Sequence, residues 1–117
     1  MSTSLLHCKH GLILAENHDM ISKVLRLYGE WAEESLELIK CFINQGSTVV
    51  DIGANIGTFT LPLSKSVGPS GSVFAFEAQR VNFYNLCANL ILNDLSWVKA
   101  YHCLAADKRS ETAIRYF

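Results

Sequence analysis

Short apolar runs alternate with helical apolar stripes along most of the chain. The runs Thr48–Ile52, Ser72–Glu77 and Trp97–Leu104 are rich in β-branched and aromatic residues, and each predicts a strand. Thr48–Ile52 shows no alternation, which is typical of a strand covered on both faces. Gly11–Glu16 predicts a strand of an N-terminal hairpin, and Thr112–Phe117 predicts a strand that begins another hairpin.

Three segments between these runs carry apolar residues at helical spacing. Glu30–Asn44 predicts one helix, and Gly57 opens the next. Pro62 removes a backbone donor from this second helix, which we therefore expect to be short or distorted. The clearest stripe follows Asn82, a predicted N-cap, and it consists of Phe83, Leu86, Cys87, Leu90 and Ile91.

The elements expected between residues 48 and 104 alternate as strand, helix, strand, helix, strand. Helices are the usual connection between parallel neighbouring strands, and such crossovers are right-handed. The fold class is therefore α/β, with a parallel sheet and helices expected on both of its faces.

Composition and charge narrow the function classes. The chain has 117 residues, 50% of them hydrophobic, and a net charge of −1 without any block of Lys or Arg. It can bury a core, and it lacks the basic patch of a protein that binds nucleic acid or an anionic membrane. The sequence shows no signal peptide and no apolar run near the ~20 residues of a membrane span. We therefore expect a cytoplasmic protein with no nucleic-acid partner and no membrane partner.

The cysteines give no sign of a metal or redox site. Cys8, Cys41, Cys87 and Cys103 form no C-x-x-C pair, and such sites need closely spaced ligands. Cys8 with His10 could supply half of a metal site, but no second pair completes it. We expect reduced thiols and no metal.

The segment Asp51–Gly57 carries the strongest chemical signal. The strand Thr48–Ile52 ends in a carboxylate and runs into Gly-Ala-Asn-Ile-Gly. Small residues let the backbone approach a ligand, and exposed amides at a helix start attract an anion. Glu77 ends the next strand, 24 positions after Gly53, where a carboxylate can accept hydrogen bonds from a ribose diol. The combination favours an adenosine-containing ligand.

The loop spacing distinguishes between adenosine cofactors. Dehydrogenases use G-x-G-x-x-G against a pyrophosphate, whereas this loop reads D-x-G-x-x-x-G with Asn55 in the middle position. Asp51 would repel a pyrophosphate, and it would suit the amino group and sulfonium of S-adenosylmethionine. A nicotinamide-binding oxidoreductase is a weaker alternative.

Several of these residues also have simpler interpretations. Asp51 could cap the amides of its own loop, and Asn55 could be a turn residue with positive φ. His102 reads as a satisfied strand histidine rather than a catalytic base. The aromatic residues Tyr28, Trp31 and Trp97 read as packing anchors.

The stretch "VVDIGANIGTFTLPLSKSVGPSGSVFAFEAQRVNFYNLCANLILN" resembles the FkbM family of S-adenosylmethionine-dependent methyltransferases. The resemblance continues through "HCLAADK" and reaches back to "LYGEW", which becomes a candidate pocket wall. It implies that the methionine end of S-adenosylmethionine lies against Asp51, Gly53, Ala54, Asn55 and Gly57. It also implies that Glu77 holds the ribose hydroxyls, with the rest of the nucleoside near Ala78, Gln79 and Ala105 or Ala106. Ala78 stands where the family often has proline, which loosens the turn after Glu77.

The resemblance further implies a Rossmann-like methyltransferase fold, of which this chain supplies a part. Residues 1–46 would form an N-terminal hairpin and helix, and residues 47–117 a cofactor-binding βαβαβ half that ends before the fourth strand. The central strand Thr48–Ile52 would then have an open edge, which an oligomer or a partner chain could cover.

The implied activity is O-methylation of a hydroxyl on a sugar, glycan or secondary metabolite. No residue of the chain identifies itself as a catalytic base, so we expect the isolated chain to be inactive and to bind the cofactor weakly or not at all. The alternative is a non-catalytic, truncated binding module.

Overall fold

A computed structural model describes residues 2–113 of the chain. Its elements, in order, are β1 (Thr3–Cys8), β2 (Gly11–Glu16), α1 (Met20–Tyr28), α2 (Glu33–Lys40), β3 (Thr48–Ile52), α3 (Thr60–Val67), β4 (Ser72–Glu77), α4 (Arg80–Leu92) and β5 (Val98–His102). The strands expected at Gly11–Glu16, Thr48–Ile52 and Ser72–Glu77 have the predicted bounds. The strand expected at Thr112–Phe117 falls largely on residues 114–117, which lie outside the described residues.

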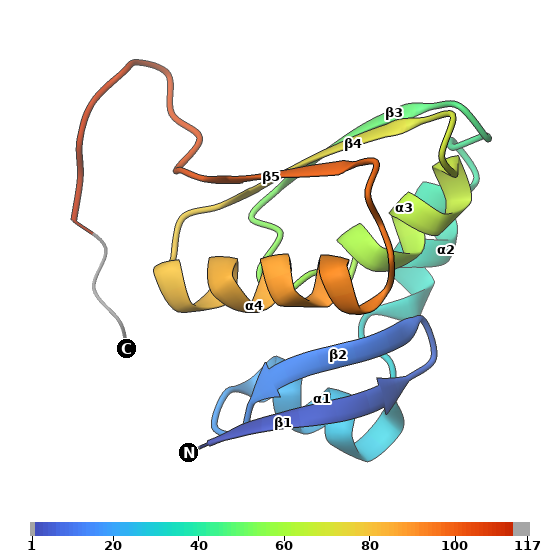
Figure 1. Cartoon of the computed structure of the whole chain (residues 1–117), viewed down its shortest axis with the longest axis vertical. Helices are drawn as coiled ribbons and strands as arrows, with labels where there is room; N and C mark the ends of the chain where they lie inside the picture. The colour runs from blue at the N-terminus through green and yellow to red at the C-terminus, as the bar shows by residue number, and fades with distance from the viewer. Residues whose placement is uncertain (1, 114–117) are drawn as a thin grey trace.

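The strands β3, β4 and β5 form a parallel sheet in that order, with Thr48 opposite Ser72 and Val73 opposite Val98. Both connecting helices, α3 and α4, lie on one face of this sheet (Figure 1). The expectation of helices on both faces is therefore wrong for the described residues. The physical reason is the strand order: the sheet grows in one direction, so right-handed crossovers bring both helices to the same side.

The other face of the sheet is uncovered in the described part of the chain. Val50 and Ile52 of β3 are 58% and 65% exposed, and Phe76 of β4 stacks on Tyr101 of β5 with ring centroids 5.1 Å apart. The prediction that Thr48–Ile52 is covered on both faces is wrong here, because alternate residues of β3 face the helices and solvent. Runs of apolar residues without polar alternation do not reveal which face a helix covers.

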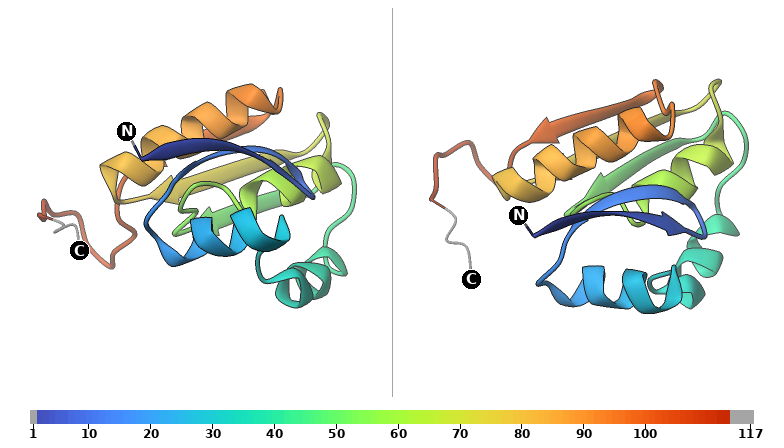
Figure 2. Two further views of the ribbon diagram at one scale, coloured as in Figure 1. Left: turned by 90° about the horizontal axis from the view of Figure 1, so that it is seen from below. Right: turned by 60° about the horizontal axis from the view of Figure 1, so that its bottom comes forward.

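The N-terminal hairpin packs on the helix layer, on the side away from the sheet (Figure 2). β1 and β2 pair antiparallel, with Thr3 opposite Glu16 at one end and Cys8 opposite Gly11 at the other. One core joins the hairpin to the rest of the molecule: it contains Ile13, Ala15, Leu25, Ala54, Ile56, Leu61, Ala75, Leu86, Leu90 and Leu95. Two of its members, Ala54 and Ile56, belong to the loop after β3, so hairpin packing and loop position depend on the same contacts.

The helices differ from their predictions mainly at their ends. α1 was not predicted, and α2 is shorter than the expected Glu30–Asn44. α4 begins at Arg80 with Gln79 as its N-cap residue, so the N-cap prediction for Asn82 is wrong. Pro62 is the third residue of α3, and the amides on both sides of it, those of Leu61 and Leu63, donate to the Gly57 and Phe59 carbonyls. The proline has no N–H to continue this series, and the helix is short, as predicted.

α4 carries an asparagine ladder, which we define as Asn85, Asn89 and Asn93. β2 pairs with β1 on one side only, so its other edge presents N–H and C=O groups. Asn89 accepts from the Leu14 amide at 2.6 Å and donates to the Leu14 carbonyl at 3.2 Å. Asn93 makes the same two bonds to Leu12, at 3.0 and 2.7 Å. Two side-chain amides thus take the place of a neighbouring strand.

The predicted stripe of α4 needs one correction. Ile91 is 76% exposed, whereas Asn85 and Asn89 are buried beside Leu86 and Leu90. The buried face of α4 is thus half polar, because it must satisfy the edge of β2. No helix within residues 2–113 is long and apolar enough to cross a membrane.

Candidate functional site

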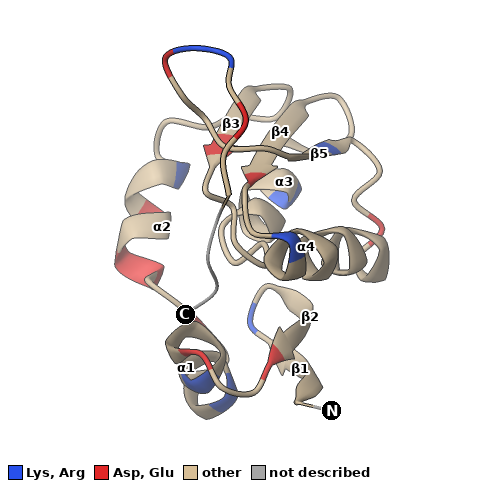
Figure 3. Cartoon of the chain, turned by 90° about the vertical axis from the view of Figure 1, so that its left-hand side faces the viewer, with Lys and Arg blue, Asp and Glu red and all other residues tan. Residues whose placement is uncertain are grey.

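Two carboxylates lie at the carboxyl ends of neighbouring parallel strands. Asp51 is the fourth residue of β3 and Glu77 the last residue of β4. Asp51 is level with Ala75 in the sheet, so Asp51, Ala75 and Glu77 point to the same, helix-facing side. Figure 3 shows acidic residues at the ends of both strands. Parallel strands bring their ligand-binding ends to one edge of a sheet.

Glu77 organises the backbone around it. Its side chain is 6% exposed, Oε2 accepts the Asn55 amide at 2.7 Å, and Oε1 accepts the Gln79 amide at 2.8 Å. One carboxylate therefore joins the loop after β3 to the turn after β4. A carboxylate has about four lone-pair sites, so two of them are still available to donors from a ligand.

The loop Gly53–Gly57 uses its own amides internally. Gly53 and Ala54 donate to the Phe76 carbonyl at 2.9 and 3.0 Å, and Gly57 donates to the Ala54 carbonyl at 2.9 Å. Asn55 donates to Glu77, and Ile56 donates to the Asn55 side-chain oxygen at 2.8 Å. The expectation that this loop offers free amides to an anion is therefore wrong, because all five donors have partners within the protein.

The loop residues differ in what they face. Ala54 and Ile56 are buried in the core. Gly57 packs beneath two leucine side chains, while a side-chain carbon at Gly53 would meet no atom within 4 Å. Asn55 has a φ of 55°, as its interpretation as a turn residue predicted. Of the residues in this loop that were predicted to contact the cofactor, Gly53 and Asn55 face open space. Ala54 and Gly57 instead pack against the core and support the loop from that side.

Asp51 is held by the first residue of α3. The Thr60 hydroxyl donates to Asp51 Oδ2 at 2.7 Å. Burial raises the pKa of the Asp51 carboxyl and the charge of Glu77 raises it further, against the opposing effect of the Thr60 hydrogen bond. The alternative interpretation, that Asp51 caps its loop amides, is wrong, because those amides bond elsewhere. Sequence analysis missed Thr60, although a hydroxyl nine residues after Asp51 at a helix start is a recognisable signal.

Asp51→Asn is expected to stabilise the ligand-free protein at pH 7. A carboxyl whose pKa is higher in the folded than in the unfolded chain binds its proton more tightly when folded, so ionisation weakens the fold. Stability therefore falls as pH rises from about 3.9, the value for an unfolded aspartate, to the higher folded value, and stays low above it. Thermal melting from pH 3.5 to 8 should show this decline in the wild type and a smaller one in the variant. A lower melting midpoint for the variant at pH 7 would contradict this assignment.

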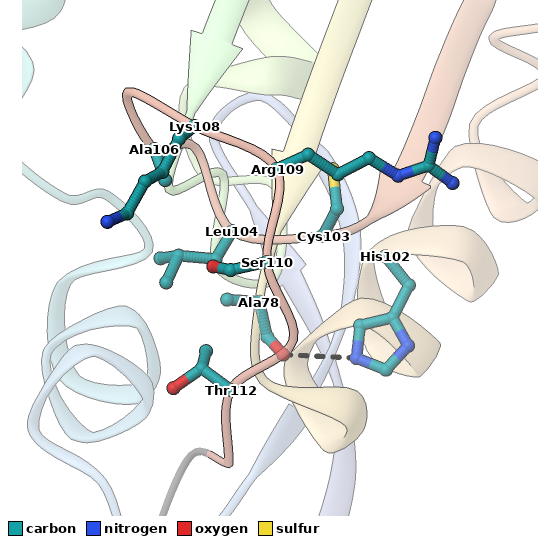
Figure 4. A pocket seen from close by; sticks show the side chains of 9 residues that line it. All are labelled: Ala78, His102, Cys103, Leu104, Ala106, Lys108, Arg109, Ser110 and Thr112. Carbon is teal, nitrogen blue, oxygen red and sulfur yellow. Dashed lines mark hydrogen bonds between the residues drawn. The ribbon is translucent and has the colours of Figure 1, made fainter.

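Three cavities open along the carboxyl edge of the sheet. The smallest, about 160 Å³, is lined by four predicted residues, Gly53, Glu77, Ala78 and Ala105, together with Ile52, Phe76, Cys103 and Leu104. A cavity of about 560 Å³ includes Ala78, Ala106, Lys108 and Arg109; Figure 4 shows its lining, with the segment after β5 crossing over Ala78. The structure thus brings Gly53, Glu77, Ala78 and Ala105 together.

The third cavity, about 640 Å³, holds Asn55 and Gln79 on one side. Its other side comes from the turn between β2 and α1, with Glu16, His18 and Asp19. Sequence analysis missed this wall. Its signal was the polar run Glu16–Asp19 directly after an apolar strand, but nothing in the sequence indicated that the hairpin lies beside the loop.

The remaining candidates are structural. Trp31 and Trp97 pack on the core as predicted, whereas Tyr28 is 73% exposed and is not a packing anchor. The wall predicted from "LYGEW" lines none of these three cavities. The His102 ring stacks on Phe83 with centroids 5.1 Å apart, and its Nε2 lies 3.0 Å from the Ala78 carbonyl.

The cysteines within residues 2–113 are free thiols. Burial raises the pKa of both Cys8 and Cys87. In the same range no three His, Cys, Asp or Glu side chains gather as a metal site would require, and the His10 ring pairs with Glu33.

Comparison with known proteins finds methyltransferases and one other transferase among the relatives of this chain. The chain is 40% identical over 70 residues to methyltransferase sdnD of Sordaria araneosa, covering 59% of this chain and 27% of that one. It is 32% identical over 97 residues to the tRNA(Phe) (4-demethylwyosine(37)-C(7)) aminocarboxypropyltransferase of Methanocaldococcus jannaschii, covering 80% and 35%. The chain spans about a third of the length of these curated relatives.

Solved structures agree on the fold. M. jannaschii TYW2 in complex with AdoMet superposes with a TM-score of 0.66 at 26% identity, covering 86% of this chain and 43% of that one. No family model matches the chain, so the FkbM family is not shown.

These relatives correct one prediction. The absence of a basic patch suggested that no nucleic acid is involved, but the M. jannaschii relative is named as acting on tRNA. A second relative, from Cryptococcus neoformans, is named as the catalytic subunit of a tRNA (adenine(58)-N(1))-methyltransferase and is 35% identical over 60 residues. The exclusion of nucleic acid was therefore wrong, because a net charge near zero over these 117 residues does not exclude a nucleic-acid substrate.

The relatives support the predicted cofactor class, since one of them was solved with AdoMet. The structural superposition over 86% of the chain also supports the predicted fold class. The chain therefore has the Rossmann-like fold of S-adenosylmethionine-dependent methyltransferases.

Proposed function

We propose that this chain forms the S-adenosylmethionine-binding part of a group-transfer enzyme. The observation that carries the proposal is the pairing of Asp51 and Glu77 at neighbouring strand ends beside a loop whose amides are all engaged. Such a site repels anions and suits a ligand that combines a positive charge with a diol. S-Adenosylmethionine has both, and its sulfonium makes an attached carbon group transferable.

Each residue of the site has a proposed task. Asp51, whose carboxyl is partly buried and carries unfavourable charge in the free protein, faces the cationic methionine end. Glu77 accepts the ribose hydroxyls while it keeps its two backbone donors. Gly53 leaves room for close approach, and Ala78, Gln79, Ala105 and Ala106 surround the nucleoside. Asn55 lines the 640 Å³ cavity, and Ala54 and Gly57 hold the loop in position from behind.

The same observations argue against a nicotinamide cofactor. A dinucleotide fold binds its pyrophosphate with free amides at the start of the first crossover helix. Here the amides of residues 53–57 donate within the protein, and Asp51 stands beside them. A pyrophosphate against this loop would have to displace these bonds and would lie near the Asp51 carboxylate.

For the acceptor, we propose a nucleoside in RNA. Two relatives with detectable identity are named as acting on tRNA. Lys108 and Arg109 line the 560 Å³ cavity at the carboxyl edge of the sheet and could contact a phosphate. The hydroxyl acceptor implied by the FkbM resemblance is the second candidate, favoured by the loop sequence.

The transferred group is a separate question. Two of these relatives are named as methyltransferases and one as an aminocarboxypropyltransferase. Both groups leave from the same sulfonium, so the cofactor-binding residues alone do not select between them. We propose methyl transfer, because the loop resembles that of FkbM methyltransferases.

The test of cofactor binding is thermal melting with S-adenosylhomocysteine. A ligand that binds only the folded state raises the melting midpoint, and tenfold excess over Kd adds about 1.4 kcal/mol, or several degrees for a domain of this size. We expect a Kd near a millimolar for the isolated chain, because one side of the site is open, and no shift with NAD at the same concentration. A larger shift with NAD, or none with S-adenosylhomocysteine at several millimolar, would overturn the proposal.

A further inference from the structure

Asn89 of the asparagine ladder contacts more than the hairpin. Its side chain is fully buried, and Nδ2 donates to the Ile56 carbonyl at 2.8 Å in addition to its bond to Leu14. Ile56 belongs to the loop after β3, whereas Leu14 belongs to β2. One side-chain amide therefore joins the hairpin, α4 and the candidate cofactor loop.

The hydrogen bonds continue from this point to the site. The Ile56 amide donates to Asn55 Oδ1 at 2.8 Å, and the Asn55 amide donates to Glu77 Oε2 at 2.7 Å. An unbroken series of bonds thus runs from the edge of β2 through Asn89 to Glu77. Groups in such a series depend on one another for their geometry.

Asn93 provides the contrast. It makes the same pair of bonds to the β2 backbone, at Leu12, but its third bond goes to the Asn89 carbonyl at 2.7 Å and not to the loop. Both residues hold the hairpin, and of the two only Asn89 bonds to the loop.

We infer that Asn89 is a positioning residue. Its side chain bonds both to the edge of β2 and to the Ile56 carbonyl, so the docked hairpin holds the loop beside Glu77 through Asn89. This inference rests on the proposed function for the task of the loop. Without the amide of Asn89, the Ile56 carbonyl loses its buried donor and the loop is free to shift relative to α4. The docked hairpin then helps to position the cofactor site.

The first test uses the ligand-free protein. Amide hydrogen exchange of Asn55 and Ile56 is measured in Asn89→Ala and in Asn93→Ala, at temperatures that give both variants equal global stability. We expect these loop amides to exchange about tenfold faster in Asn89→Ala, since members of one network couple by amounts of that order. Equal exchange in the two variants would overturn the inference, whatever the protein binds.

The second test measures S-adenosylhomocysteine affinity by NMR titration at the same matched stability. Asn89→Ala should bind about tenfold more weakly than Asn93→Ala. If the wild type does not bind, the proposed function fails, and the exchange experiment still decides the role of Asn89. Where Asn89→Ala does not fold, Asn89→Leu replaces it, because leucine fills a similar volume and offers no donor to the Ile56 carbonyl; loop exchange equal to that of Asn93→Ala would again overturn the inference.

Discussion

Replacing Glu77 with alanine is expected to lower the free energy of unfolding by about 2–6 kcal/mol and to abolish measurable binding of S-adenosylhomocysteine. The carboxylate accepts hydrogen bonds from the amides of Asn55 and Gln79, at 2.7 and 2.8 Å. Its removal takes the acceptor away from both N–H groups. Each such loss costs about 1–3 kcal/mol in a protected position. Urea unfolding gives the stability change, and NMR titration gives the affinity.

Two variants separate the structural from the binding contribution of Glu77. Glu77→Gln keeps the shape but offers one acceptor oxygen instead of two, so it should retain part of the stability and lose about 10- to 100-fold in affinity. Glu34→Ala, at an exposed position of α2, is the matched control and should change neither quantity. Unchanged affinity in Glu77→Gln would contradict a role for this carboxylate in holding the ribose.

The fold could be predicted from the sequence where local patterns decide it. β4 is Ser72–Glu77, as its apolar run indicated, and the parallel order follows from the alternation with helices. The arrangement in space could not be predicted in the same way. The direction in which the sheet grows determines which face α3 and α4 cover. An apolar run such as Thr48–Ile52 is compatible with helices on one face and with helices on both.

The site was predictable in its chemistry and less so in its contacts. The spacing of Asp51 and Glu77 indicated two carboxylates at one edge, and the structure brings their strands together. That the loop amides are already satisfied depends on Glu77 and on the Phe76 carbonyl, more than 20 residues away in the chain. Non-local partners of this kind leave no periodic signal.

The asparagine ladder shows a signal that sequence analysis overlooked. Asn85, Asn89 and Asn93 are spaced four apart, as an apolar stripe would be, and Asn89 is fully buried. A polar stripe at helical spacing beside an apolar one indicates a helix that must satisfy buried backbone groups. Hydrophobic periodicity alone placed Ile91 on the buried side of the helix, where it does not lie: it is 76% exposed.

Gly57→Ala is expected to destabilise the protein by about 2–4 kcal/mol, more than an alanine at the other glycine of the loop. Gly57 has a φ of 100°, and a side-chain carbon there would lie 2.9 Å from Leu61 Cδ1 and 3.1 Å from Leu86 Cδ1. Both leucines are fully buried, so neither can yield without disturbing the core. Urea unfolding measures the loss.

Gly53→Ala is the matched control for this loss. Its φ of 75° carries a similar backbone penalty, but the added carbon meets no atom within 4 Å, so only about 1–2 kcal/mol should be lost. The new methyl group would instead project beside the 160 Å³ cavity that Gly53 lines and should weaken S-adenosylhomocysteine binding. The substitution at Gly57 would then mainly lower stability, and the substitution at Gly53 would mainly weaken ligand binding. Equal losses of stability in the two variants would show that backbone conformation, and not packing against the leucines, determines the need for Gly57.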